Sequence, residues 1–195
     1  MDFSDEEITA LKRYMSAEDV SPGGESYCFG VNNHLRRGLR HCELPAALQN
    51  HVTILDQVLS RGSLKNDTTV YRGIGSLCEM AGAFNPNDEF RSLGFWSTSV
   101  EQTATDSFIT GSGPVGGVYK INLNAGFPGV NLGAENTFNS LGCGESEVLL
   151  PRGILWRIIN FSRICGDDVP RIHQSKYESI LNFELVPASN KPFSP

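Results

Sequence analysis

The sequence lacks the cysteine and histidine patterns that mark disulfide frameworks and zinc sites. Its five cysteines are an odd number without any C-x-x-C pair, and its four histidines show no metal-ligand spacing. We therefore expect no metal and no disulfide scaffold, and a reducing compartment is the simpler environment for such a chain.

Long apolar runs and clusters of basic residues are missing as well. No stretch approaches the roughly 18 apolar residues of a membrane span, and the acidic residues 1–7 do not form a signal peptide. The formal net charge is −6 and the basic residues are dispersed, which argues against nucleic acid or a membrane as the main partner. A small phosphate-bearing ligand is not excluded, because one or two arginines suffice to hold it.

Helical signals fill the first third of the chain, and β-type signals fill the rest. A capping box begins at Ser4, a short periodic segment covers residues 27–39, and an apolar stripe runs from Pro45 to Gly62. Short β-type runs, separated by Gly, Pro and Asn, then cover residues 69–72, 94–100, 117–123, 145–150, 154–161 and 180–186.

This order of elements predicts an α+β domain. Helix does not alternate with strand, so helices followed by a largely antiparallel β core fit better than a doubly wound parallel sheet. We expect a single domain over residues 1–187, with a helical part (1–66), a β core (67–187) and a loose polar tail (188–195).

The first chemically suggestive motif is the strand segment 69–73, which contains Arg72 followed by Gly73. An arginine inside an apolar strand is costly unless its charge has a partner, and its planar fork suits a diphosphate or a carboxylate. The glycine would let a ligand approach the backbone closely. Taken alone, such an arginine more often belongs to a structural salt bridge or lies on an edge strand.

The second motif ends an aromatic strand with three hydroxyl residues, Ser97, Thr98 and Ser99. These side chains could line a polar pocket. Equally, Ser99 could form a turn and cap the helix that follows it.

The third motif is the Glu-x-Glu of residues 145–147, which opens an apolar strand. Residues i and i+2 of a strand point to the same face, so Glu145 and Glu147 would stand about 6 to 7 Å apart. Two negative charges at this spacing repel each other and raise the pKa of one of the two carboxyl groups. A fold seldom retains such a pair for stability alone. A lone pair of this kind could also be gatekeeping charges on a solvated edge strand.

In combination and in this order, the three motifs resemble the Arg–Ser–Glu class of ADP-ribosyltransferases, which includes bacterial toxins and injected effectors. The segment from Tyr27 through Asn32 to Arg36 is similar to that family's N-terminal helix motif, and the resemblance spans residues 27–186. It implies an ADP-ribosyltransferase-like fold, with N-terminal helices followed by a core of two packed, mainly antiparallel β-sheets.

The resemblance also implies roles for the matched residues. Glu147 would stabilise the oxocarbenium-like cation that forms when the nicotinamide–ribose bond of NAD breaks. Glu145 would hold a target arginine and help remove its proton, and a Glu at this place points to arginine acceptors. The resemblance further implies that Arg72 binds an NAD phosphate, that Gly73 lies on the nicotinamide side and that Ser97 orients Glu147. Thr98 would support the pocket, and Asn32 and Arg36 would bind on the adenosine and phosphate side of NAD. Phe138 would contact the target protein.

The implied function is transfer of ADP-ribose from NAD to an arginine of a host target protein. From the habits of the family we expect a monomeric bacterial effector that is secreted and acts in the host-cell cytosol. One departure motivates alternatives: many family members place an arginine in the loop after the hydroxyl motif, whereas residues 111–117 are uncharged here. A catalytically inactive module that binds an arginine-containing peptide, and an NAD glycohydrolase, therefore remain open.

Overall fold

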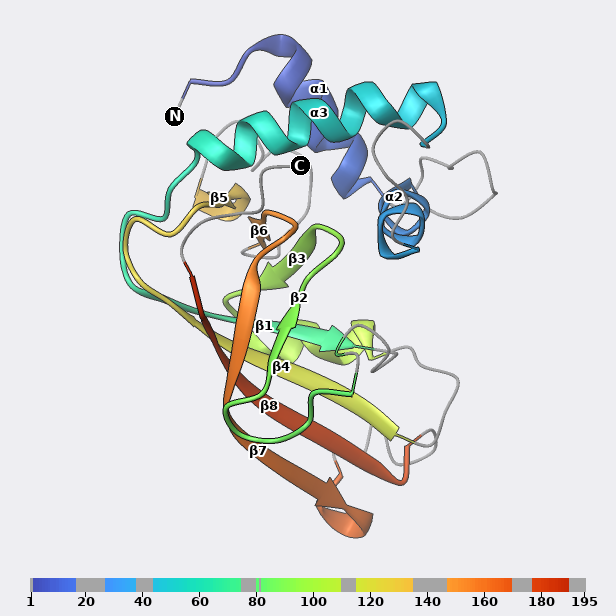
Figure 1. Ribbon diagram of the computed structural model, residues 1–195, viewed down its shortest axis with the longest axis vertical. Helices are drawn as coiled ribbons and strands as arrows, with labels where there is room; N and C mark the ends of the chain where they lie inside the picture. The colour runs from blue at the N-terminus through green and yellow to red at the C-terminus, as the bar shows by residue number, and fades with distance from the viewer. Residues whose placement is uncertain are drawn as a thin grey trace.

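The computed structural model of the chain describes residues 2–16, 27–37, 44–74, 80, 82–109, 115–134, 147–169 and 177–189 (Figure 1). The α-helices in these ranges are α1 (Asp5–Met15), α2 (Tyr27–Arg36) and α3 (Ala46–Arg61). The strands are β1 (Thr68–Ile74), β2 (Glu89–Arg91), β3 (Trp96–Ser99), β4 (Val115–Leu123), β5 (Val130–Asn131), β6 (Glu147–Leu150), β7 (Leu155–Cys165) and β8 (Ser179–Pro187). Short 3-10 helices are η3 (Gln102–Phe108), η4 (Leu132–Ala134) and η6 (Gly166–Asp168).

The helices begin and end where local chemistry dictates. At the start of α1, the N–H of Glu7 donates to Ser4 Oγ at 3.3 Å and the N–H of Ser4 donates to Glu7 Oε2 at 2.8 Å, which is the predicted capping box. Pro45 and Gly62 flank α3, as the sequence predicts. No helix within the described ranges is long and apolar enough to cross a membrane.

The strands form one mixed sheet in the order β2-β7-β8-β4-β1-β3-β6-β5, in which only the β4–β8 pair is parallel. Each predicted β run coincides with a strand, whereas β2 and β5 were not predicted because they are only three and two residues long. The α+β class is confirmed.

The two packed sheets of the prediction are continuous in the structure: β2, β7, β8, β4 and β1 form one arm of the sheet, and β3, β6 and β5 form the outer arm. The arms join at β1 and β3, whose register is a single residue pair, Tyr71 with Ser99. Beyond this joint the sheet folds over on itself. Trp96 of β3 therefore stacks on Trp156 of β7, with ring centroids 4.9 Å apart, although four places separate these strands in the sheet order.

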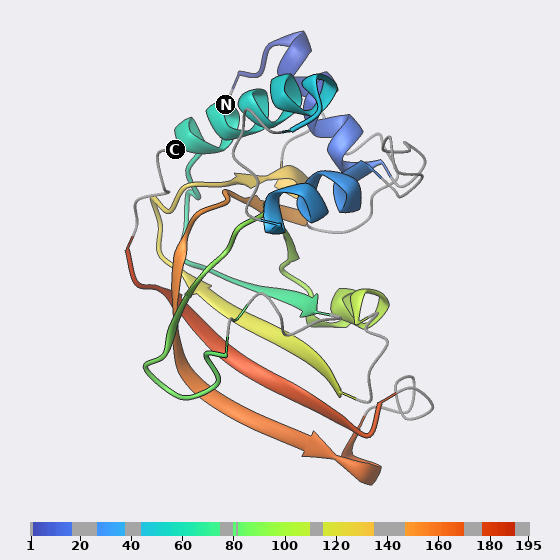
Figure 2. The same ribbon diagram turned by 45° about the vertical axis from the view of Figure 1, so that its right-hand side comes forward.

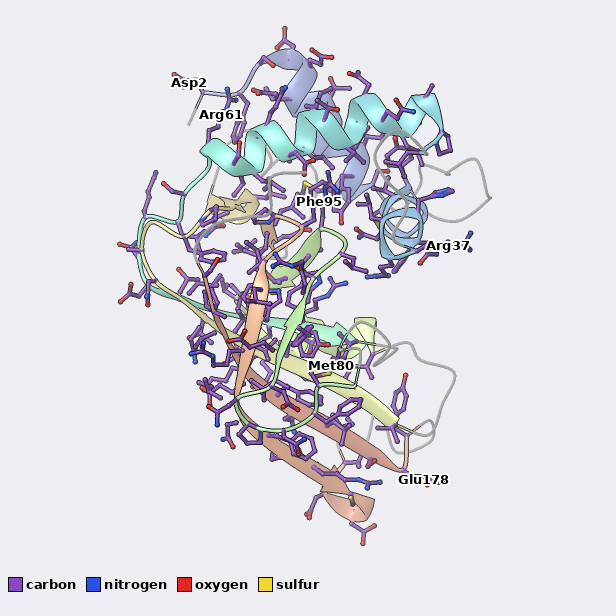
Figure 3. All side chains as sticks on the ribbon, viewed as in Figure 1. Asp2, Arg37, Arg61, Met80, Phe95 and Glu178 are labelled. Carbon is purple, nitrogen blue, oxygen red and sulfur yellow. The ribbon has the colours of Figure 1, made fainter. Side chains whose placement is uncertain are left out.

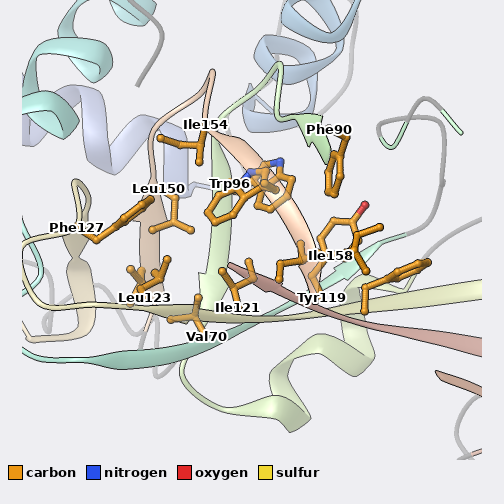
Figure 4. Close-up of a cluster of buried hydrophobic side chains, with 14 of the residues drawn as sticks. Val70, Phe90, Trp96, Tyr119, Ile121, Leu123, Phe127, Leu150, Ile154 and Ile158 are labelled. Carbon is orange, nitrogen blue, oxygen red and sulfur yellow. The ribbon is translucent and has the colours of Figure 1, made fainter. Parts of the chain in front are cut away.

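The main hydrophobic core fills the space between the two arms (Figure 4). A second core lies between the helices and the outer arm, where Phe95 and Leu149 pack against residues of α1, α2 and α3 such as Leu11, Val31 and Leu55. Figure 2 shows the three helices gathered at one end of the molecule, while β4, β7 and β8 run away from them.

A bidentate ion pair ties α3 to the turn that follows β6. Arg152 Nε lies 3.0 and 3.1 Å from the two carboxylate oxygens of Asp56, and Arg152 Nη2 lies 2.6 Å from Asp56 Oδ2. Both side chains are partly buried, so this planar contact fixes the helical layer against the outer arm of the sheet.

Candidate active site

Ser97 and Glu147 meet where β3 pairs with β6. Ser97 is opposite Leu149 and Ser99 is opposite Glu147, so Ser97 and Glu147 are diagonal neighbours on one face of the sheet. The Ser97 hydroxyl donates a hydrogen bond to Glu147 Oε1. Both residues are half-buried, which leaves the carboxylate oriented by the strand pair and still within reach of a ligand.

Arg72 reaches the same point from β1. Its Nη1 donates to the carbonyl oxygen of Ser97 at 2.8 Å, and its guanidinium carbon lies 5.7 Å from the ring centroid of Trp96. Its Nε is buried and has no hydrogen-bond partner among the residues described. A buried donor without a partner is costly, and an acceptor on a bound anion would satisfy it. Gly73, the next residue of β1, is buried.

The other two hydroxyl residues of the motif support the strand and the turn after it. Thr98 is buried, and its Oγ1 donates to the carbonyl oxygen of Val148 at 2.6 Å, which fastens β3 to β6. Ser99 Oγ accepts a hydrogen bond of 3.0 Å from the N–H of Glu101, at the entrance to η3. Ser99 therefore stabilises a turn, which was one of the two interpretations of this motif.

The α2 residues that the resemblance placed at the cofactor differ in their surroundings. Asn32 is only 5% exposed, and its amide is engaged on both sides: Nδ2 donates to the Tyr14 hydroxyl at 2.7 Å, and Oδ1 accepts from the N–H of Phe95 at 2.9 Å. Arg36 lies about one turn further along α2 and is half-buried. Glu145, Phe138 and the loop 110–114 lie outside the described residues, as do residues 190–195 of the expected tail.

Tyr14 of α1 is a member of this region that the sequence did not single out. Its hydroxyl accepts from Asn32 and donates to the carbonyl oxygen of Phe95 at 3.4 Å. Burial raises the pKa of the Tyr14 phenol well above its usual range; Cys28 and, to a smaller extent, Glu147 add to the shift, while Asn32 and Arg72 oppose it. The phenol is therefore neutral and within electrostatic range of two of the predicted catalytic groups.

Comparisons with known proteins bear on the family and the fold of the chain. A family model described as ADP-ribosyltransferase exoenzyme matches residues 2–180. Compared by sequence alone, no curated protein matches the chain significantly.

Solved structures share the fold at low sequence identity. The ADP-ribosyltransferase toxin Plx2a from Paenibacillus larvae is 18% identical, with 96% of this chain and 88% of that chain covered and a TM-score of 0.64. An ADP-ribosyltransferase from Clostridium botulinum is 17% identical, with coverages of 94% and 87% and a TM-score of 0.59. Exoenzyme S from Pseudomonas aeruginosa, solved with human 14-3-3 protein beta and bound to Carba-NAD, is 14% identical, with coverages of 98% and 78% and a TM-score of 0.66.

The match of the family model over nearly the whole chain establishes the family, and the solved structures show that the fold is shared. The chain belongs to the ADP-ribosyltransferase exoenzyme family, whose members transfer ADP-ribose from NAD.

Proposed function

We propose that the chain is a mono-ADP-ribosyltransferase that transfers ADP-ribose from NAD to an arginine of a host target protein. The observation that carries the proposal is the convergence of Arg72, Ser97 and Glu147, which come from three strands and are joined through Ser97. An isolated structural ion pair would not need this arrangement, because Arg72 bonds to a backbone carbonyl and its Nε has no partner within the described ranges.

The chemistry of NAD cleavage accounts for these residues. As the nicotinamide–ribose bond breaks, nicotinamide leaves with the bonding electrons and positive charge develops on the ribose. In the proposal, the Glu147 carboxylate stabilises this charge and the Ser97 hydroxyl keeps the carboxylate oriented. A charge that is oriented in advance lowers the barrier because it need not reorganise during the reaction. The Arg72 guanidinium holds a phosphate of NAD, Gly73 lies on the nicotinamide side, and Thr98 supports the strand behind the pocket.

Arginine specificity rests on Glu145 and the residues around it. The target guanidinium forms the new bond to the ribose carbon through one nitrogen and loses a proton, which Glu145 accepts in the proposal. A carboxylate receives a guanidinium fork bidentately, so Glu145 suits this acceptor. Phe138, in the segment before the glutamates, is proposed to contact the target protein, and Arg36 is proposed to supply a second positive charge for NAD.

The proposed partner is a protein of a host cell, and the proposed source is a bacterium that secretes the chain. The Exoenzyme S neighbour was solved with a human protein and an NAD analogue, which supports a host partner and NAD as the second substrate. We propose that the chain acts as a monomer in the host-cell cytosol.

The decisive assay uses labelled NAD with agmatine, a small arginine mimic, and with host-cell lysate. The wild-type chain should release nicotinamide and label both acceptors. Glu145→Gln should lose transfer to agmatine and keep NAD hydrolysis. Glu178→Gln is a suitable control, because this exposed carboxylate lies at the far end of the sheet from Phe95 (Figure 3) and should change neither reaction.

The absence of charge from residues 111–117 leaves two other functions to be tested in the same assay. Hydrolysis without any labelled acceptor would identify an NAD glycohydrolase. The absence of both nicotinamide release and NAD binding, together with binding of an arginine-containing peptide, would identify an inactive binding module. Either result would replace the transferase proposal.

A further inference from the structure

The strand that carries Ser97 has one edge that no other strand of the described residues covers before Ser99. On one side, β3 pairs with β6 along its whole length. On the other side, β1 meets β3 only at Ser99, because the two arms of the sheet diverge there. Alternate residues of a strand direct their backbone groups to the same edge, so Phe95, Ser97 and Ser99 share this side.

Side chains take the place of the missing strand along this edge. The carbonyl of Ser97 accepts from Arg72, while the N–H of Phe95 donates to Asn32 Oδ1 at 2.9 Å. The carbonyl of Phe95 accepts from the Tyr14 hydroxyl at 3.4 Å. Each contact satisfies a backbone group that would otherwise be an unpaired strand-edge donor or acceptor. Two of the three contacts come from the helices.

The helical contacts form one closed and tightly packed unit. Asn32 Nδ2 donates to the Tyr14 hydroxyl at 2.7 Å, and the rings of Tyr14 and Phe95 meet edge to face with centroids 5.9 Å apart. Asn32 and Tyr14 are 5% and 2% exposed. A Cβ atom on Gly94 would lie 2.5 Å from Asn32 Oδ1, so the close approach of Asn32 to the backbone depends on a glycine at this position.

We propose that Asn32 and Tyr14 are positioning residues of the reaction: they fix the backbone at Phe95, and thereby place the Ser97 hydroxyl that orients Glu147. This inference rests on the proposed function for its catalytic consequence. It differs from a direct contact of Asn32 with NAD, because both polar atoms of its amide are already engaged by the protein.

Phe95 and Ser97 are two residues apart in an extended strand, about 6.5 Å, with no flexible segment between them. A displacement of the backbone at Phe95 therefore passes directly to Ser97. Misplacing a catalytic group by about 1 Å costs on the order of 100-fold in rate, whereas the affinity for NAD depends on other contacts.

Three variants test the inference against a matched control, with NAD hydrolysis measured per folded molecule. Asn32→Leu removes both amide contacts at similar size, Gly94→Ala displaces the Asn32 side chain, and Tyr14→Phe removes only the hydroxyl. Leu55→Ala is the control, because Leu55 is buried in the same helical core and its side chain forms no hydrogen bond.

We expect kcat to fall about 10- to 100-fold in Asn32→Leu and in Gly94→Ala, and less in Tyr14→Phe, with KM for NAD changed by less than about threefold. Leu55→Ala should keep kcat within about twofold while lowering stability. A rise in KM confined to Asn32→Leu would overturn the inference and make Asn32 a cofactor contact. An equal loss of kcat in Leu55→Ala would also overturn it, because general loosening would then explain the effect.

Amide hydrogen exchange of the peptide 93–99 gives a readout that does not depend on turnover. Exchange should be about fivefold or more faster in Asn32→Leu than in Leu55→Ala, at matched global stability. If the wild-type chain does not turn over NAD, the proposed function fails, and the exchange data still decide whether Asn32 fixes this segment. Equal protection in the two variants would overturn the inference whatever the activity.

Discussion

Removal of the Ser97 hydroxyl is the perturbation whose effect follows most directly from the geometry. In Ser97→Ala, the Glu147 carboxylate loses a hydrogen-bond donor while the β3–β6 ladder stays intact. A hydrogen bond to a charged group contributes about 1.5–3 kcal/mol. If this contribution is realised in the transition state, kcat for nicotinamide release should fall about 10- to 150-fold.

The neighbouring residue supplies a matched control for this experiment. Thr98→Val removes a hydroxyl from the same strand, but that hydroxyl bonds to the carbonyl oxygen of Val148 and does not touch the carboxylate. The variant should lose about 1 kcal/mol of stability in urea denaturation and keep kcat within about twofold. If Ser97→Ala retained kcat within threefold of wild type, or if Thr98→Val lost as much as Ser97→Ala, the assigned role of Ser97 would be refuted.

Three further outcomes follow from contacts elsewhere in the molecule. Arg152→Ala, which breaks the bidentate ion pair between α3 and the turn after β6, should lower the free energy of unfolding by about 1–2 kcal/mol in urea titration, and Arg152→Lys should recover less than half of it. The hydrogen bond from Lys120 lowers the pKa of Glu184 from its ordinary value of 4.5. This pair therefore stabilises the fold at pH values above 4.5, and its contribution is lost as the pH falls through the lowered pKa. In Lys120→Met, the free energy of unfolding should depend less on pH below 4.5. NAD bound at Arg72, close to Trp96, should change the tryptophan emission of the wild type, and an Arg72→Ala variant should lose this change.

Strong local signals explain why much of the fold was predictable. The capping box at Ser4, the flanking Pro45 and Gly62, and the short β-type runs each depend on a few neighbouring positions. The joining of the two arms depends on a single residue pair between β1 and β3, and no local pattern encodes such a contact. This is why one continuous sheet was not anticipated.

The site shows the same division between local and long-range information. The order of the three motifs pointed to Ser97 and Glu147, which lie 50 residues apart and are bonded in the fold. Asn32 was placed at the cofactor by resemblance, but the partner of its Oδ1 is a backbone N–H 63 residues away. Tyr14 lies on the buried face of α1, where helical periodicity alone predicts an ordinary core residue.

The release of nicotinamide by wild type and by Glu147→Gln tests the central proposal most directly. Glutamine keeps the size of the side chain and can still accept from Ser97, but it carries no charge to stabilise the ribosyl cation. With NAD affinity measured in parallel by calorimetry, nicotinamide release should fall at least about 100-fold at nearly unchanged affinity. Release that stays within tenfold of wild type would contradict the assignment of Glu147 as the catalytic carboxylate.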